Sequence, residues 1–251
     1  MLKKNSFKQK KISNIKKNIS FFYQERKRVE NLKYFEKKCL SDGFNCVVGI
    51  DEVGRGALAG PVVAAAVAIN DINYFHINDI KDSKKLNRVK REKIFELIIS
   101  KSENIGIGIV GPDVIDKINI AQATFLAMKR SIAALKIIPD YILVDGFKIP
   151  NIGVPQNNIV KGEDKSISIA AASIIAKVYR DNIMFNFHKK YPVYQFDKNV
   201  GYGTKNHLAA IKDYGISPIH RKTFRGVLTD MNKLENSKQK KLYLYNNDIH
   251  K

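Results

Sequence analysis

The sequence CVVGIDEVGRGALAGPVVAAAVAI, residues 46–69, decides the fold. It contains two apolar runs, 46–53 and 62–69, with a glycine-rich segment between them. Short runs of this kind, bounded by glycine and proline, are typical of strands buried on both faces. We therefore predict two strands joined by a turn.

Helix-like and strand-like periodicities alternate in the rest of the chain. We expect a helical extension from about Phe22 that ends at Asp42-Gly43. Interleaved elements of this kind are typical of an α/β domain with a central mixed β-sheet flanked by helices. The expected strands are 104–110, 141–145 and 158–161, and the expected helices are 88–101, 119–136, 166–190 and 207–214.

Basic residues are concentrated at the two ends of the chain. The 251 residues include 44 Lys and Arg against 24 Asp and Glu, a net charge of +20. Residues 1–44 hold 13 basic and 4 acidic residues, and residues 231–251 hold 5 and 2. We therefore divide the chain into a basic arm plus helix (1–44), a central domain (45–230) and a polar tail (231–251). The charge indicates a polyanionic partner, either nucleic acid or an anionic membrane surface.

Several protein classes are disfavoured by the composition. No apolar run is long enough to span a bilayer, and no apolar segment follows Lys3 and Lys4 as in a secretory signal. Cys39 and Cys46 are the only cysteines, too few for a disulfide framework or a zinc cluster. These features favour a cytoplasmic protein.

Acidic residues occur where an acid is unexpected. Asp51 and Glu52 end one expected strand, Asp145 ends another, and Asp181 lies inside an expected helix. Oxygen ligands without His or Cys suit Mg²⁺ or Mn²⁺, and such ions support phosphodiester hydrolysis. Each position also has an alternative without a metal: Asp145-Gly146 is a turn, Asp51-Glu52 is a capped turn, and Asp181 forms a surface ion pair with Lys177.

The segment 54–59, Gly-Arg-Gly-Ala-Leu-Ala, has two readings besides an ordinary hairpin turn. It matches the loose dinucleotide-binding pattern G-x-G-x-x-G/A, which would make the chain a nucleotide-cofactor oxidoreductase. That motif requires a helix to follow the glycines, and here an expected strand follows. The second reading is that Gly54 and Gly56 let the backbone approach a ligand, with Arg55 between them.

At this point the chain resembles a known family, bacterial ribonuclease HII, the type 2 ribonuclease H. The matching strings run in family order from about residue 29 to 226. They are GIDEVGRGALAGPVV (49–63), DSKKL (82–86), IDKINI (115–120), LVDG (143–146), SIAAASIIAKV (168–178) with RD (180–181), GYGT (201–204) with His207, and HRKTF (220–224).

The resemblance implies a ribonuclease H-like fold with a helical C-terminal region, and a monomer without membrane contact. It implies that four carboxylates, Asp51, Glu52, Asp145 and Asp181, bind Mg²⁺ or Mn²⁺ and carry catalysis. It implies that Gly54, Arg55 and Gly56 recognise a ribonucleotide, that Tyr202 stacks on the next sugar, and that Lys84 lies near the substrate backbone. The implied substrates are RNA–DNA hybrids and duplex DNA with single ribonucleotides, cut on the 5′ side to leave a 3′-hydroxyl and a 5′-phosphate.

Two positions depart from the family pattern. Glu163 follows Lys161-Gly162 where the family commonly has Asp, and Tyr179 replaces a smaller residue. Ribonuclease HIII, a second type 2 enzyme that could be confused with this family, lacks an arginine like Arg55 and has a folded N-terminal domain, for which residues 1–44 are too short and polar. A protein that binds hybrid duplexes without cutting them is the other functional class to be tested.

Overall fold

The computed structural model describes residues 19–69, 72, 87–102 and 104–227. Residues 19–32 are helical and precede α2 (Tyr34–Ser41). Lys84, the basic segment 1–18 and the tail 231–251 lie outside the described residues. The elements are α2 (Tyr34–Ser41), β1 (Val47–Val53), β2 (Val62–Ala68), α3 (Arg88–Lys101), β3 (Asn104–Val110), α4 (Pro112–Ala133), β4 (Tyr141–Asp145), β5 (Gln156–Ile159), α5 (Ile167–Lys190), α6 (Phe196–Asn199) and α7 (Lys205–Tyr214).

The five strands form one mixed sheet in the order β3-β2-β1-β4-β5. β1, β2 and β3 pair antiparallel, whereas β1, β4 and β5 pair parallel. The glycine-rich segment joins β1 directly to β2 as a strand–turn–strand unit, and no helix follows the glycines. The expected α/β fold with a central mixed sheet is therefore confirmed, and the dinucleotide-binding arrangement is absent from this part of the described chain.

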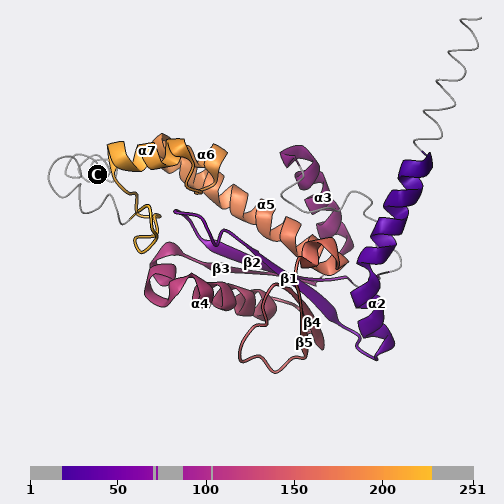
Figure 1. Cartoon of the computed structure of the whole chain (residues 1–251). Coiled ribbons are helices and arrows are strands. Elements are labelled where there is room, and N and C mark those ends of the chain that lie inside the picture. Colours follow the sequence, from indigo (N-terminus) through magenta and orange to yellow (C-terminus); the bar gives the residue numbers. More distant parts are fainter. Residues whose placement is uncertain (1–18, 70–71, 73–86, 103, 228–251) are drawn as a thin grey trace, which may run out of the picture.

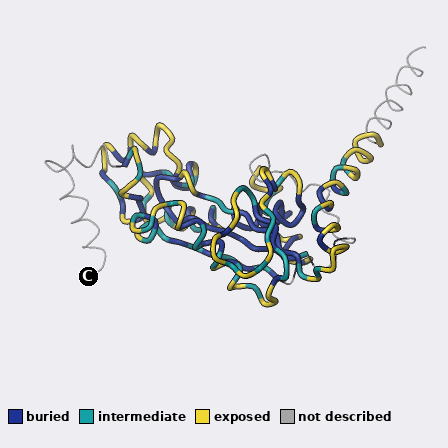
Figure 2. Tube along the Cα trace, turned by 60° about the horizontal axis from the view of Figure 1, so that its bottom comes forward, coloured by how far each residue is buried: buried dark blue, intermediate teal, exposed yellow. Residues whose placement is uncertain are grey.

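Helices cover both faces of the sheet (Figure 1). α5, α3 and the N-terminal helix pack on one face, against side chains such as Val63, Ala65 and Val67. α4 packs on the other face, against Val62, Ala64 and Ala66. The strict alternation along β2 follows from the two-residue period of a strand, and both faces are apolar because both are covered. Figure 2 shows that burial is concentrated in the sheet and in α5, while the start of the N-terminal helix is exposed.

The central helix α5 approaches the sheet closely because β1 carries a glycine there. A Cβ built on Gly49 would lie 2.2 Å from the backbone carbon of Ser168. The first turn of α5 also contacts α2, because the buried Glu36 carboxylate accepts hydrogen bonds from Ser168 N and Oγ at 3.0 and 2.6 Å. The N-terminal helical extension is thus packed onto the sheet domain.

Three predicted boundaries were wrong. α4 begins at Pro112, seven residues earlier than predicted, because Gly111 and Pro112 form a helix start. Asn119 has φ 66° and interrupts α4, and its Oδ1 accepts hydrogen bonds from the amides of Ala121 and Gln122. β5 spans Gln156–Ile159 instead of 158–161, since Lys161 is left-handed, and α7 begins at Lys205 after its Thr204 cap.

Among the described helices, none is long and apolar enough to cross a membrane.

Candidate active site

Three carboxylates converge where β4 ends beside β1. Asp51 lies in β1 beyond its pairing with β4, Asp145 is the last residue of β4, and Glu163 follows β5 in a short 3₁₀ turn. One oxygen from each of the three residues lies within 4.8 Å of the others. Asp145 is oriented by the amide of Gly162, which donates a 2.7 Å hydrogen bond to its Oδ1.

The environment of Asp51 and of its neighbour Glu52 disfavours negative charge. Burial raises the pKa of Asp51 well above its ordinary value, and the charges of Glu52, Asp145 and Glu163 raise it further, against a smaller lowering by the Ser173 hydroxyl. Burial also raises the pKa of Glu52, which Arg55 partly offsets. Neighbouring carboxylates with raised pKa values, as at Asp51 and Glu52, are a frequent feature of functional sites.

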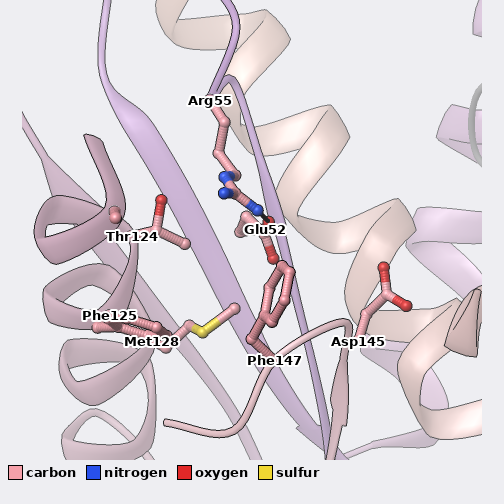
Figure 3. Close-up of a pocket in the computed structure, with 8 residues that line it drawn as sticks. Glu52, Arg55, Thr124, Phe125, Met128, Asp145 and Phe147 are labelled. Carbon is pink, nitrogen blue, oxygen red and sulfur yellow. Dashed lines mark hydrogen bonds and ion pairs between the residues drawn. The ribbon is translucent and has the colours of Figure 1, made fainter. Parts of the chain in front are cut away.

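Glu52 lies on the opposite face of β1 from Asp51, because adjacent strand residues alternate and β1 continues to Val53. It borders a cavity of about 290 Å³ lined also by Arg55, Asp145 and side chains of α4. Figure 3 shows Thr124, Phe125 and Met128 projecting from α4 on one side of Glu52 and Asp145 on the other. Glu52 Oε1 accepts a 3.1 Å hydrogen bond from Arg55, whereas the buried Oε2 has no hydrogen-bond partner among the described residues.

Asp181 is not among the carboxylates that converge. It lies on α5 and pairs with two cations, Lys177 Nζ at 2.8 Å and Arg91 Nη1 at 3.4 Å. The Lys177 contact is the (i, i+4) ion pair that the helical spacing predicts. Asp181 is therefore held by charge compensation in this structure.

The Gly54–Gly56 turn after β1 lies against Tyr202, the aromatic residue predicted to stack on the substrate sugar. A Cβ on Gly56 would lie 4.0 Å from the Tyr202 ring, and Gly54 has φ 91°, which favours glycine. Tyr202 and Arg55 are both exposed. The turn and Tyr202 therefore form one surface, adjacent to the cavity that Glu52 and Arg55 border. Lys84 cannot be placed relative to it, since it lies outside the described residues.

A buried pair of histidines supports Tyr202 from behind. The amide of Ser217 donates to His220 Nδ1 at 2.9 Å, so His220 carries its proton on Nε2 and donates to His207 Nε2 at 3.0 Å. His207 then donates from Nδ1 to the carbonyl of Tyr202 at 2.9 Å. This series of hydrogen bonds requires both imidazoles to be neutral, and burial lowers the pKa of each.

The sequence analysis missed several residues of this region. Glu163 entered it only as a departure from a family pattern, although an acid two residues after the expected strand 158–161 was a usable signal. Arg180, Arg221 and the two histidines were noted within motifs without a role. Nothing in the sequence marks a buried arginine, because its partners here are backbone carbonyls of distant segments.

The acidic cluster fits a divalent cation. Its donors are oxygen atoms only, as Mg²⁺ and Mn²⁺ prefer, and they lie close enough to share an ion. The partnerless Oε2 of Glu52 and the raised pKa values of Asp51 and Glu52 are further evidence, because a nearby cation would compensate both.

Comparisons with known proteins identify the family of the chain. The family model described as Ribonuclease HII matches residues 48–227. The ribonuclease HII of Clostridioides difficile is 50% identical over 215 residues, which cover 86% of this chain and 81% of the relative.

Solved structures show the same fold. The ribonuclease H2 of Pyrococcus horikoshii is 26% identical, with a TM-score of 0.66, and the match covers 76% of this chain and all of that one. Bst-RNase HIII in complex with Mn²⁺ is 18% identical, with a TM-score of 0.58 and coverage of 76% and 71%, and therefore supports the fold alone. The fold is thus the ribonuclease H-like fold. The chain belongs to the ribonuclease HII family, and it is an endonuclease of the hydrolase class.

Proposed function

We propose that this chain hydrolyses the RNA strand of RNA–DNA hybrids and cuts on the 5′ side of single ribonucleotides embedded in duplex DNA, leaving a 3′-hydroxyl and a 5′-phosphate. The observation that carries the proposal is the carboxylate cluster of Asp51, Asp145 and Glu163, whose Asp145 borders the same cavity as Arg55 of the Gly54–Gly56 turn, with Tyr202 against that turn. One part of this region can hold a metal ion, and the other can contact a sugar. The cellular roles would be ribonucleotide removal and RNA primer processing.

Catalysis is assigned to Asp51, Glu52, Asp145 and Asp181, with Glu163 added from the geometry. Asp51, Asp145 and Glu163 would hold a Mg²⁺ or Mn²⁺ ion, and Glu52 offers a further oxygen from the other face of β1. When bound, such an ion activates a water and stabilises the leaving oxygen of the phosphodiester. Bst-RNase HIII has been solved with Mn²⁺, which makes Mn²⁺ a reasonable first probe. For Asp181 to join, it must exchange its contacts with Lys177 and Arg91.

Substrate recognition is assigned to Gly54, Arg55, Gly56 and Tyr202. The 2′-hydroxyl is the group that distinguishes a ribonucleotide within DNA, and a glycine turn lets backbone groups approach it closely. The exposed ring of Tyr202 offers a flat apolar surface for the sugar that follows. Lys84 is proposed as a contact to the substrate backbone on the resemblance alone.

The partner, compartment, oligomeric state and domain division of the enzyme are also proposals. A net charge of +20 suits a nucleic-acid partner, and we propose a cytoplasmic monomer whose catalytic domain spans 45–230, preceded by the basic arm and helix of 1–44 and followed by the polar tail of 231–251. Size-exclusion chromatography with light scattering tests the monomer, since a dimer would have a measured mass twice the 28.5 kDa of the chain.

The deciding experiment uses an end-labelled DNA duplex that contains one ribonucleotide. It is incubated with the protein and Mg²⁺, with Mn²⁺, and with chelator. The proposal requires one metal-dependent cut on the 5′ side of the ribonucleotide. Cleavage only within a long hybrid tract would reduce the proposal to hybrid hydrolysis, and absence of cleavage on both substrates would favour the binding-only protein.

A further inference from the structure

Two buried arginine side chains enclose the glycine-rich turn. Arg180 on α5 and Arg221 after α7 each have no solvent exposure. Arg221 donates from Nη2 to the carbonyl of Gly54 at 2.7 Å, from Nη1 to that of Arg55 at 2.8 Å, and from Nε to that of Gly60 at 3.0 Å. Arg180 donates to the carbonyls of Pro61, Ala59 and Val200 at 2.9, 3.2 and 2.9 Å.

All six acceptors are neutral carbonyl oxygens, and five of them belong to residues 54–61. Within the described part of the chain, neither guanidinium forms an ion pair with a carboxylate. Burying an uncompensated cation is costly, and burial lowers the pKa of both arginines. The benefit that we set against this cost is the fixing of the segment that both cations contact, which is the turn.

These contacts determine which way the amide groups of the turn point. The peptide bonds of the described chain are trans, so the C=O of one residue and the N–H of the next point in opposite directions. The carbonyls of Gly54 and Arg55 point inward to Arg221. The N–H groups of Arg55 and Gly56 therefore point away from it, and neither has a hydrogen-bond partner among the described residues.

Arg180 connects the turn to the aromatic on the same surface. Its guanidinium carbon lies 5.5 Å from the centroid of the Tyr202 ring, within cation–π range. Its contact with the carbonyl of Val200 also holds the chain just before Gly201 and Tyr202. A Cβ on Gly54 would lie 2.2 Å from Arg180 Nε, so the turn fits tightly against this side chain.

We propose that Arg180 and Arg221 are positioning residues for ribonucleotide recognition: they fix the turn so that the N–H groups of Arg55 and Gly56 are presented to an oxygen acceptor on the ribose or its phosphate. This proposal rests on the proposed function of the turn and names the side chains that set its geometry. A lysine at either position keeps the charge but has one ammonium in place of the planar, three-nitrogen fork that bridges several carbonyls.

The test compares Arg221→Lys with the wild-type chain and with Arg225→Lys, an exposed arginine nearby. Affinity is measured in chelator, where no cleavage occurs, for an all-DNA duplex and for the same duplex with one ribonucleotide. The discrimination ratio is expected to fall by about tenfold in Arg221→Lys, as for one lost hydrogen bond, and to stay unchanged in Arg225→Lys. A merely structural role would lower the folded fraction, which weakens both affinities equally and leaves the ratio unchanged.

The outcomes separate this inference from the function on which it rests. If the wild-type chain cuts at the ribonucleotide and discriminates, but Arg221→Lys discriminates equally well, only the positioning role is overturned. If the wild-type chain neither cuts there nor discriminates, the proposed recognition fails and this inference fails with it.

A second measurement on the wild-type chain covers the case in which Arg221→Lys and Arg180→Lys do not fold. The Nε–H groups of both arginines and the amides of Arg55 and Gly56 are followed by ¹⁵N NMR. The duplex with one ribonucleotide is expected to shift all four signals, and the all-DNA duplex none. Shifts of the two amides without any shift of the guanidinium signals would overturn the proposal.

Discussion

Asp51 and Asp145 occupy equivalent positions on the parallel strands β1 and β4, one residue beyond the last pair of their register. Ile50 pairs with Val144, so the next residue of each strand is an aspartate, and one carboxylate oxygen of each lies within 4.8 Å of the other. β4 ends at Asp145 while β1 continues. The parallel pairing therefore places two acids from distant parts of the sequence side by side at the carboxyl ends of their strands, where α/β sheets form their sites.

Removing the charge of Asp145 should abolish most cleavage without abolishing binding. We expect Asp145→Asn to lose on the order of 100-fold or more in rate, because loss of a metal ligand should exceed the 10–100-fold typical of outer-shell partners. Duplex affinity should be kept or increased, since a negative charge is removed near a polyanion. Asp164→Asn, at an exposed acid near the cluster, is the matched control. Equal rates in the two variants would exclude Asp145 from catalysis.

Divalent cations should stabilise the folded chain through the acidic cluster. At 100 times the dissociation constant, an ion that binds only the folded state adds about 2.7 kcal/mol. Asp51→Asn should reduce this response in thermal denaturation and should raise the melting temperature in chelator, because it removes a buried charge that three acids repel. A melting temperature that is insensitive to Mg²⁺ and Mn²⁺ in the wild-type chain would argue against the metal site.

Glu163 should behave as a ligand despite its departure from the family pattern. We expect Glu163→Asp to keep metal-dependent cleavage and Glu163→Gln to require roughly tenfold more metal, because only the first keeps a carboxylate beside Asp51 and Asp145. The measurement is the Mn²⁺ dependence of the cleavage rate. The prediction is wrong if Glu163→Gln and the wild-type chain reach half-maximal rate at the same Mn²⁺ concentration.

The histidine pair should make the chain acid-sensitive. Burial, and then the repulsion that a protonated His207 would exert, lowers the pKa of His220 to about 3, whereas an unfolded histidine titrates near its ordinary pKa of 6.5. Between these values the unfolded state binds more protons, so the free energy of unfolding falls as the pH falls below about 6.5.

Urea denaturation at pH 7.5 and at pH 5 measures this effect. His220 should contribute a loss of about 2 kcal/mol between the two values. His220→Gln should lack that contribution while keeping the acidic groups that titrate in the same range, so its loss should be smaller than in the wild-type chain. An equal loss in both proteins would show that His220 is not buried as a neutral group.

The basic segment 1–18 should add nonspecific duplex affinity. It holds seven lysines and no acid, and each neutralised phosphate adds about 0.9 to the slope of log affinity against log salt. A chain that begins at residue 19 should therefore show a shallower slope on an all-DNA duplex. Identical slopes for the two chains would assign no binding role to this segment.

The sequence by itself determined the two strands around the glycine turn, the α/β class and the acids at the ends of β1 and β4. These features follow from local patterns: apolar runs, glycine and proline at their borders, and an acid that ends an apolar run. The predicted start of α4 was wrong because Asn119 interrupts a helix that begins earlier. A left-handed residue within a helix leaves no periodic signal in the sequence.

Only the tertiary structure decided which groups meet. The two-residue period of β1 puts Asp51 and Glu52 on opposite faces, and β5 and its following turn bring Glu163, rather than Asp181, to Asp51. The roles of Arg180 and Arg221 likewise depend on carbonyls about 120 and 160 residues away in sequence. Contacts between a side chain and a distant backbone have no sequence signature, because every residue carries the same carbonyl group.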